Sequence, residues 1–314
     1  MKNFRKILIV CFLILVVFAA SCAQLIQKKG KETPSAVWRL GSQGLVLNFA
    51  TNLPPTKLYD NEEFNALIEI KNVGAFRVGG PGDRLYLSGF APAILPGIST
   101  IGEKIPDIEG KSEFNPQGAF DSVAFKSPIS RLTVDRYSFN LLATACYQYE
   151  TKAEAGVCID PQPFAPAVRP KICIPTSVAL SGGQAAPIAV TSVALEPRPG
   201  LTIFRITVQN VGGGQAFRAG LEYLTKCSPY DLRGLAFEDV DYVQLFEVSL
   251  AGTSILSTCK PLDRGHIRLS GGIGTVVCEA RTYGASAYVA PLTIGLRYGY
   301  QNWISLPIEI FRTP

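Results

Sequence analysis

The sequence predicts an all-β protein made of two tandem β-sandwich domains behind an N-terminal hydrophobic segment. Its 314 residues leave room for two domains of ordinary size once that segment is set aside. The chain is rich in turn formers, with 29 Gly and 22 Pro, and only 18% of its residues are charged. A strand-like pattern of alternating apolar residues also occurs twice along the chain. These features favour many short strands and few helices.

The first 22 residues have the layout of a secretory signal. Three basic residues precede the apolar run 7–20, which ends in Ala-Ala-Ser before Cys22. This ending resembles a lipobox, in which the cysteine becomes the lipidated first residue of the mature protein, although the usual Leu at its first position is absent. Cys22 is therefore the expected lipidation site.

Two other interpretations of this segment stay open. The uncharged stretch 7–26 is long enough to cross a bilayer, which would make it an uncleaved anchor, and simple secretion is the third possibility. In the first two cases the chain is held to a membrane, through the lipid on Cys22 or through an N-terminal helix. Residues 23–36 are polar without periodicity, which is typical of a tether. The expected location is extracytoplasmic, at the cell surface.

Two segments with one pattern indicate a duplication. In residues 64–76 and 202–217 apolar residues alternate, and each run ends at Asn-Val-Gly, beginning at Asn72 and at Asn210. Alternation of this period places one set of side chains on one face of a strand. The residues expected to face the core are Phe64, Ala66, Ile68 and Ile70 in the first segment and Phe204, Ile206 and Val208 in the second.

A second correspondence joins residues that lie 151 positions apart near the end of each copy, as Tyr147 and Tyr298 do. The matched residues are Tyr137, Leu141, Tyr147, Tyr149 and Ile159 with Tyr288, Leu292, Tyr298, Tyr300 and Ile310. Residues 292–300 alternate strictly between large and small or polar side chains, as a strand with one face on a core requires. The tyrosines are thus expected in the core or on a sheet face, in preference to a sugar-stacking platform.

The two offsets set the predicted domain boundaries. The offset is 138 residues at the Asn-Val-Gly motif and 151 at the tyrosines, so the second copy has gained about thirteen residues in between, as loops allow. We expect one sandwich over residues 37–160, a stiff Pro-rich joint over 161–186 and a second sandwich over 187–314. Further strands are predicted at 45–49, 85–87, 242–250 and 275–282.

The repeated unit resembles the CARDB-type and related immunoglobulin-like domains of prokaryotic surface proteins. The resemblance rests on a strand that opens with an apolar residue, runs into Asn-Val-Gly and is followed by small apolar residues. It implies two tandem immunoglobulin-like β-sandwiches with a role in adhesion or structural presentation. The first unit departs from the pattern between residues 89 and 125, where a long irregular stretch replaces regular strands.

The cysteines indicate an oxidising compartment. Apart from Cys11 and Cys22 in the signal, six remain, an even number that implies disulfides in an exported chain. They are Cys146, Cys158, Cys173, Cys227, Cys259 and Cys278.

Three pairings are expected. Cys146 is expected to pair with Cys158, because the two residues flank a short turn around residues 152–154. The matched positions, Arg297 and Glu309, carry opposite charges that would also lie across a hairpin. Cys259 is expected to pair with Cys278 across a Gly-rich turn. Elimination then leaves Cys173 with Cys227.

Other candidate chemistry is weak. His266 is the single histidine and follows an Asp-Arg-Gly turn, so a surface loop is a better interpretation than a general base. Residues 60–63 and 238–241 cluster carboxylates without the order of an EF-hand, which favours solvated turns over calcium sites. The run 212–214 is expected to form a turn, because no Lys-Ser/Thr follows it as in a phosphate-binding loop. No metal site and no cofactor is expected.

We expect a non-catalytic structural or adhesive surface protein that contacts another surface protein or copies of itself and binds no nucleic acid. The second possibility is a carbohydrate-binding lipoprotein in which the stretch 89–125 forms a pocket wall and aromatics such as Phe90 and Phe114 bind the ligand. The third is a hydrolase that uses His266.

Overall fold

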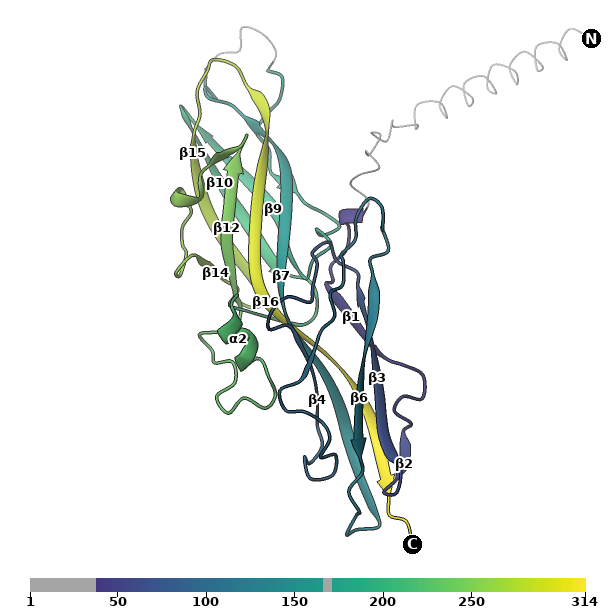
Figure 1. The fold of residues 1–314 in the computed structure, drawn as a ribbon. Coiled ribbons are helices and arrows are strands. Elements are labelled where there is room, and N and C mark those ends of the chain that lie inside the picture. Colours follow the sequence, from purple (N-terminus) through teal and green to yellow (C-terminus); the bar gives the residue numbers. More distant parts are fainter. Residues whose placement is uncertain (1–37, 166–170) are drawn as a thin grey trace, which may run out of the picture. The chain divides into compact units, whose positions relative to one another are not determined.

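Two strands of 24 residues, β7 (Arg136–Ile159) and β16 (Tyr288–Phe311), pair antiparallel along their whole length in the computed structural model of the protein (Figure 1). The structure describes residues 38–165 and 171–314, and residues 38–314 form one compact unit. The predicted division into two separate domains is therefore not confirmed. The described residues are nearly all in strands and turns, so the all-β expectation is confirmed.

The described strands form three sheets, and this pair lies in the third. The first has the order β1 (Leu45–Phe49), β3 (Glu63–Asn72), β6 (Phe120–Pro128). The second has the order β15 (Ile273–Arg281), β10 (Leu201–Asn210), β9 (Ile188–Arg198), β8 (Val178–Ala179). The third has the order β13 (Thr253–Ser254), β12 (Tyr242–Leu250), β16, β7, β4 (Arg84–Ser88), β5 (Glu103–Lys104).

Short elements complete the fold. The strands β11 (Gln215–Phe217) and β2 (Lys57–Tyr59) pair with β16, and β14 (His266–Arg268) pairs with β12. The helical segments of the described residues include α2 (Leu221–Lys226) and the 3₁₀ turn η3 (Leu256–Thr258). The third sheet, which contains β7 and β16, contributes strands to two lobes. The first lobe joins the sheet β1-β3-β6 to β4 and to residues 136–147 and 300–311, and the second joins the sheet β15-β10-β9-β8 to β12 and to residues 149–159 and 288–298.

The duplicated strands are paired with each other. Gln148 lies opposite Gly299, the residue 151 positions later, so β7 and β16 are related by a local two-fold axis at this pair. Each strand begins in one lobe and ends in the other. The duplication predicted from the sequence is thus seen as internal symmetry, whereas the predicted hairpin turn at residues 152–154 is wrong. Those residues lie in β7 opposite residues 293–295, because Ala153, Ala155 and Val157 continue the alternation of buried side chains.

The alternation in β3 and β10 has the predicted faces. Phe64, Ala66, Ile68 and Ile70 are buried, and so are Phe204, Ile206 and Val208. One continuous core contains both sets together with Tyr147, Tyr149, Tyr298 and Tyr300. The structure thus confirms the core placement of these tyrosines, which are too buried to stack on a sugar.

The four tyrosines form a ring about the local two-fold axis. Neighbouring ring centroids are 5.9–6.2 Å apart, for the pairs 147–149, 149–298, 298–300 and 300–147. Each hydroxyl has a hydrogen-bond partner, as a buried phenol requires. The Tyr147 hydroxyl accepts the N–H of Leu45 at 3.3 Å, and the Tyr298 hydroxyl accepts the N–H of Ile188 at 3.3 Å, at the matching position of β9.

The repeated Asn-Val-Gly motif serves the other two tyrosines. Asn210 Oδ1 accepts the Tyr300 hydroxyl at 3.1 Å, and Asn210 Nδ2 donates to the Gly214 carbonyl at 2.8 Å. Asn72 closes the same loop in the first copy by donating to the Phe76 carbonyl at 2.7 Å. The asparagine of the motif therefore closes the loop at the end of the strand and binds the hydroxyl of a buried tyrosine.

The glycine of this motif leaves room for the tyrosine. A Cβ atom on Gly74 would lie 1.8 Å from the Tyr149 hydroxyl oxygen. We expect Gly74→Ala to lower the free energy of unfolding by about 1–3 kcal/mol or more, because the ring must move out of a packed core. Gly156→Ala is the matched control, since its Cβ would meet one atom at 3.9 Å. Urea unfolding followed by circular dichroism measures both, and equal stabilities would contradict this account.

Candidate functional site

His266, the single imidazole, is held in a structural setting. It lies in β14 half-buried, its ring meets Tyr242 edge to face, and its Nδ1 lies 2.9 Å from the Arg264 carbonyl. Burial lowers the pKa of His266, so the neutral ring dominates at pH 7. Within the described residues, no hydroxyl or thiol hydrogen-bonds to this ring. The expected surface loop is thus replaced by a short strand.

In each of the carboxylate clusters, at residues 60–63 and 238–241, one buried aspartate binds donors of the chain itself. Asp60 accepts the Thr313 hydroxyl at 2.6 Å and the Leu132 N–H at 3.0 Å. These hydrogen bonds, with the Thr313 hydroxyl first, lower the pKa of Asp60 to about 2. Asp239 pairs with Lys226 at 3.0 Å. Among residues 38–165 and 171–314, no three metal-ligating side chains are grouped as a metal site.

The disulfides differ in part from the expected pairs. Cys146 bonds to Cys227 and Cys158 to Cys173, so the predicted pairs Cys146 with Cys158 and Cys173 with Cys227 are wrong. Both Cys146 and Cys158 lie on β7, where twelve residues of extended chain span about 40 Å. Arg297 and Glu309, which match Cys146 and Cys158 in the second copy, are also far apart on one strand. Arg297 pairs with Glu150, and Glu309 pairs with Arg136.

The predicted pair Cys259 with Cys278 is present. It joins the η3 turn to the neighbouring strand β15. All six candidate cysteines are therefore in disulfides, which is typical of proteins that fold in an oxidising compartment.

The Cys146–Cys227 bond fastens an insertion of the second copy onto the first lobe. Residues 218–241, between β11 and β12, contain α2 and lie within the interval where the sequence predicts the insertion. Leu224 and Cys227 pack with Tyr86, Cys146 and Phe217 in a small second core. The Tyr230 hydroxyl adds a hydrogen bond to the Leu87 carbonyl at 2.5 Å.

Removing this bond should release the insertion. We expect Cys146→Ala/Cys227→Ala to lower the free energy of unfolding by about 2–4 kcal/mol and to open Lys226 and Arg233 to trypsin. Cys158→Ala/Cys173→Ala is the matched control, because it closes a shorter loop elsewhere. Limited proteolysis with mass spectrometry measures the cleavage, and unchanged cleavage at both sites would show that the insertion is held without the bond.

The two aromatic side chains considered for carbohydrate binding lie in different settings. Phe90 packs edge to face on Phe139 at 6.0 Å, whereas Phe114 is 96% exposed. Residues of the stretch 89–125 do line clefts: Thr100 and Ile101 line one that also contains Tyr86 and Tyr230.

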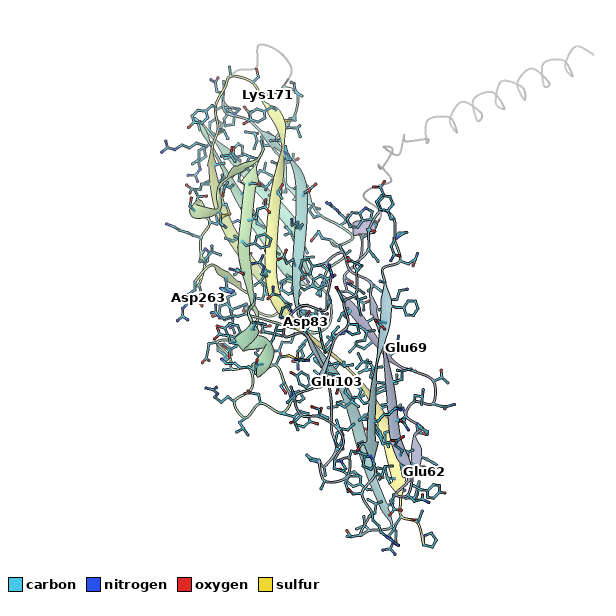
Figure 2. All side chains as sticks on the ribbon, viewed as in Figure 1. Glu62, Glu69, Asp83, Glu103, Lys171 and Asp263 are labelled. Atoms are coloured by element: carbon cyan, nitrogen blue, oxygen red, sulfur yellow. A yellow bond between two sulfur atoms is a disulfide. The ribbon has the colours of Figure 1, made fainter. Side chains whose placement is uncertain are left out.

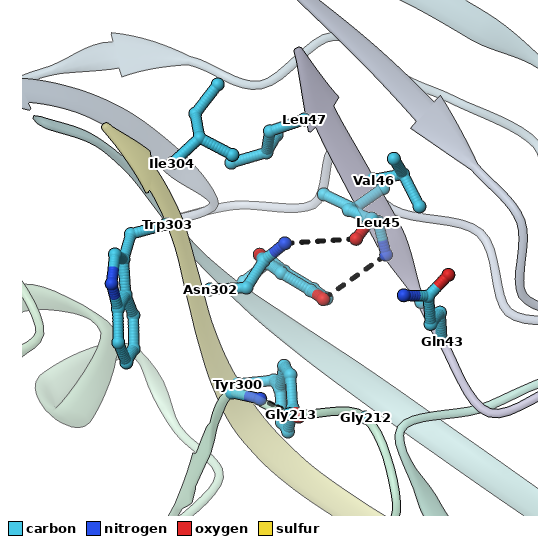
Figure 3. Close-up of a pocket in the computed structure, with 13 residues that line it drawn as sticks. Gln43, Leu45, Val46, Leu47, Gly212, Gly213, Tyr300, Asn302, Trp303 and Ile304 are labelled. Atoms are coloured by element: carbon cyan, nitrogen blue, oxygen red, sulfur yellow. Dashed lines mark hydrogen bonds between the residues drawn. The ribbon is translucent and has the colours of Figure 1, made fainter. Parts of the chain in front are cut away.

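The best-defined candidate site is an uncharged cleft of about 240 Å³ between β1 and β16, which we call the β1–β16 cleft (Figure 3). It is lined by Gln43, Gly44, Leu45, Val46, Leu47, Tyr147, Gly212, Gly213, Gly214, Tyr300, Asn302, Trp303 and Ile304. Two side chains bridge its inner end (Figure 3): the Tyr147 hydroxyl binds the Leu45 N–H, and Asn302 Nδ2 donates to the Leu45 carbonyl at 3.0 Å. Asn302 Oδ1 is buried and has no partner within the described part of the chain.

One wall of the cleft is the outer edge of β1. The Leu45 backbone points outward, to Tyr147 and Asn302, instead of to its neighbour Asn72 in β3. Because hydrogen-bonded and non-bonded pairs alternate in an antiparallel ladder, the N–H and C=O of Leu47 also point outward. No hydrogen bond joins either group to another residue in the described ranges.

The other wall is the outer edge of β16. The Glu309 N–H points away from β7 and donates to Thr56 at 2.8 Å, so the N–H groups at positions 303 and 305 point the same way. On this side β11 pairs with residues 299–301 and β2 with residues 309–311. The edge between them is free within the described residues, and Trp303 stands exposed beside it.

The predicted export features lie outside the described residues. These are the segment 1–22 with Cys22 and the tether 23–36. Within the ranges 38–165 and 171–314, no helix has the length and apolar character to cross a membrane.

Comparison with known proteins identifies no family. No protein-family model and no curated protein matches the chain. A search of solved structures pairs it with, among others, a serine-rich repeat adhesion glycoprotein from Streptococcus agalactiae, at 9% identity and a TM-score of 0.18, over 90% of this chain and 100% of that one. A TM-score of this size does not establish a common fold, so nothing about the adhesin is transferred. The resemblance to CARDB-type immunoglobulin-like domains is not confirmed.

Proposed function

We propose that the protein is a non-catalytic module of the cell surface, held at a membrane and contacting other proteins through its sheet edges. The observation that carries this proposal is the free pair of strand edges at the β1–β16 cleft, on a frame made rigid by disulfides and a shared core. Exposed backbone edges are a recurring means by which proteins recruit extended segments of partners.

The remaining chemistry supports a binding role. The His266 ring faces a backbone carbonyl, and the clustered carboxylates at 60 and 239 are occupied by internal donors. Three disulfides fit an exported protein. The lipidation of Cys22 and the immunoglobulin-like character of the lobes are the finer parts of this proposal, motivated by the sequence pattern.

Attachment is tested by the Cys22→Ala variant. We expect the wild-type protein to fractionate with membranes and its mature N-terminal peptide to begin at a lipid-modified Cys22, as measured by intact mass and peptide mass. The variant should lack the lipid mass. An unmodified wild-type chain that still begins at Met1 would contradict lipidation and favour the uncleaved anchor.

Contact with other proteins is tested on intact cells. Chemical cross-linking at the surface, followed by denaturing purification of the tagged chain, should yield a discrete heavier species that contains a second protein. His266→Ala serves as the control, because it changes the only imidazole and lies outside the β1–β16 cleft. If only the uncross-linked chain is recovered, or if a hydrolase screen shows activity that His266→Ala abolishes, the proposed function fails.

A further inference from the structure

The second lobe contains a filled counterpart of the β1–β16 cleft. Ile188 lies opposite Asn210 as Leu45 lies opposite Asn72, so Val190 corresponds to Leu47. In the second lobe the outward backbone groups of Val190 are both satisfied. Gln184 Oε1 accepts the Val190 N–H at 2.8 Å, and Gln184 Nε2 donates to the Val190 carbonyl at 3.1 Å.

The filling segment is an extended strand of the same chain. β8 pairs with β9 through Val178 and Ala179, and the N–H of Leu180 donates to the Thr191 carbonyl at 2.9 Å. β8 also lies against β7, the strand that corresponds to β16. Residues 178–184 therefore cover, in the second lobe, the edge of β9 whose counterpart on β1 is free within the described residues.

Within residues 38–165 and 171–314, no segment covers the edge of β1 in the same way. The residues just before β9 fold back onto it, whereas those just before β1 lead to the second lobe. There the Gly41 N–H donates to the Gly182 carbonyl at 2.8 Å, and Arg39 lies 3.6 Å from Glu154. The described segment 38–43 thus leaves the edge of β1 at Leu47 free.

We propose that the β1–β16 cleft binds an extended, uncharged segment of another polypeptide by strand addition, in the place that residues 178–184 occupy in the second lobe. The segment pairs with the outward groups of Leu47 and of positions 303 and 305, and its apolar residues pack beside Trp303. This inference rests on the proposed function and names the surface that the partner contacts.

The charges at the two edges agree with this occupant. On β7 the positions that correspond to Trp303 and Ser305 are Lys152 and Glu154, and charged side chains on a strand edge disfavour pairing with another chain. The edge of β16 carries neither charge, because Trp and Ser stand at these positions. Pro307 lies two residues further on, and without an N–H it ends the run of outward donors. The free edge is therefore short and is matched to a few residues of an uncharged strand.

The probe is a fluorescein-labelled peptide with the sequence of residues 176–187, the segment that fills the second lobe. Fluorescence anisotropy measures its binding to the purified full-length protein in detergent. We expect saturable binding that is about tenfold tighter than binding of a scrambled peptide, because only the ordered sequence places its side chains in register. Absence of saturable binding, or equal binding of both peptides, overturns the proposal.

Two variants locate the site. Ser305→Pro removes an outward N–H while the bonds to β7 remain, and Trp303→Lys adds a charge at the edge. Each should weaken binding about tenfold with an unchanged melting temperature. Lys152→Glu, at the position of β7 that corresponds to Trp303, lies in the second lobe and is the matched control, so it should leave binding unchanged. Equal effects of all three variants overturn the location.

Sedimentation and cross-linking separate the other outcomes. If the full-length protein forms dimers that Ser305→Pro dissociates, the occupant is a second copy and the proposal of another polypeptide is overturned. If the cross-linked surface species persists in Ser305→Pro, the proposed function stands and the strand-addition site is wrong. Loss of that species in Ser305→Pro, with the wild-type level in Lys152→Glu, supports both.

Discussion

The ladder between β7 and β16 is the constraint on which the rest of the structure depends. It joins the two copies of a duplicated strand about a local axis at Gln148 and Gly299, so neither lobe is complete without the last strand of the other copy. The tyrosine ring lies at this axis and connects the ladder to the loops and strands on either side through its hydroxyls. A chain built this way has no hinge between its lobes along the ladder, because bending there would break a continuous row of backbone hydrogen bonds and open a closely packed core.

The departures from symmetry determine how the two lobes differ on their surfaces. The second copy carries the insertion with α2, and the disulfide from Cys227 fixes it on the outer face of the first lobe. The second lobe also receives β8 and the Gln184 amide, which satisfy the edge of β9, while no described residue pairs with the matching edge of β1. In Figure 2, Glu62, Glu69 and Asp263 lie toward the edges of the molecule, whereas Asp83 lies nearer its middle, where the N–H groups of Gly79, Gly80 and Gln148 donate to its carboxylate.

Much of the fold was predictable because alternation is a local signal. The buried faces of β3 and β10 and the core position of Tyr147 and Tyr298 follow from side-chain period, and the duplication follows from the recurrence of that pattern along the chain. The partner of a strand is not a local property. Residues 152–154 carry two charged side chains that a turn would also accept, and only the ladder with β16 shows that they continue β7. The error in the disulfides has the same source, since a hairpin would have brought Cys146 near Cys158. The pair Cys259 with Cys278 was found because its two residues flank one Gly-rich turn. The β1–β16 cleft could not be predicted from the sequence, because an edge is recognised as free only by comparison with the matching edge of β9, which residues 178–184 cover.

The exchange of final strands also bears on the origin of the chain. A single copy of the repeat, on its own, would end in a strand of the length of β7 or β16. Half of that strand would extend beyond its own lobe without a partner. Two such copies would complete each other as an isologous dimer, with Gln148 or its counterpart on the axis. Joining two such copies in one polypeptide would hold the halves at a fixed stoichiometry and let each half diverge. The two lobes do differ in this way: the edge of β9 is covered by residues 178–184, whereas the matching edge of β1 lines a cleft in the described part of the chain.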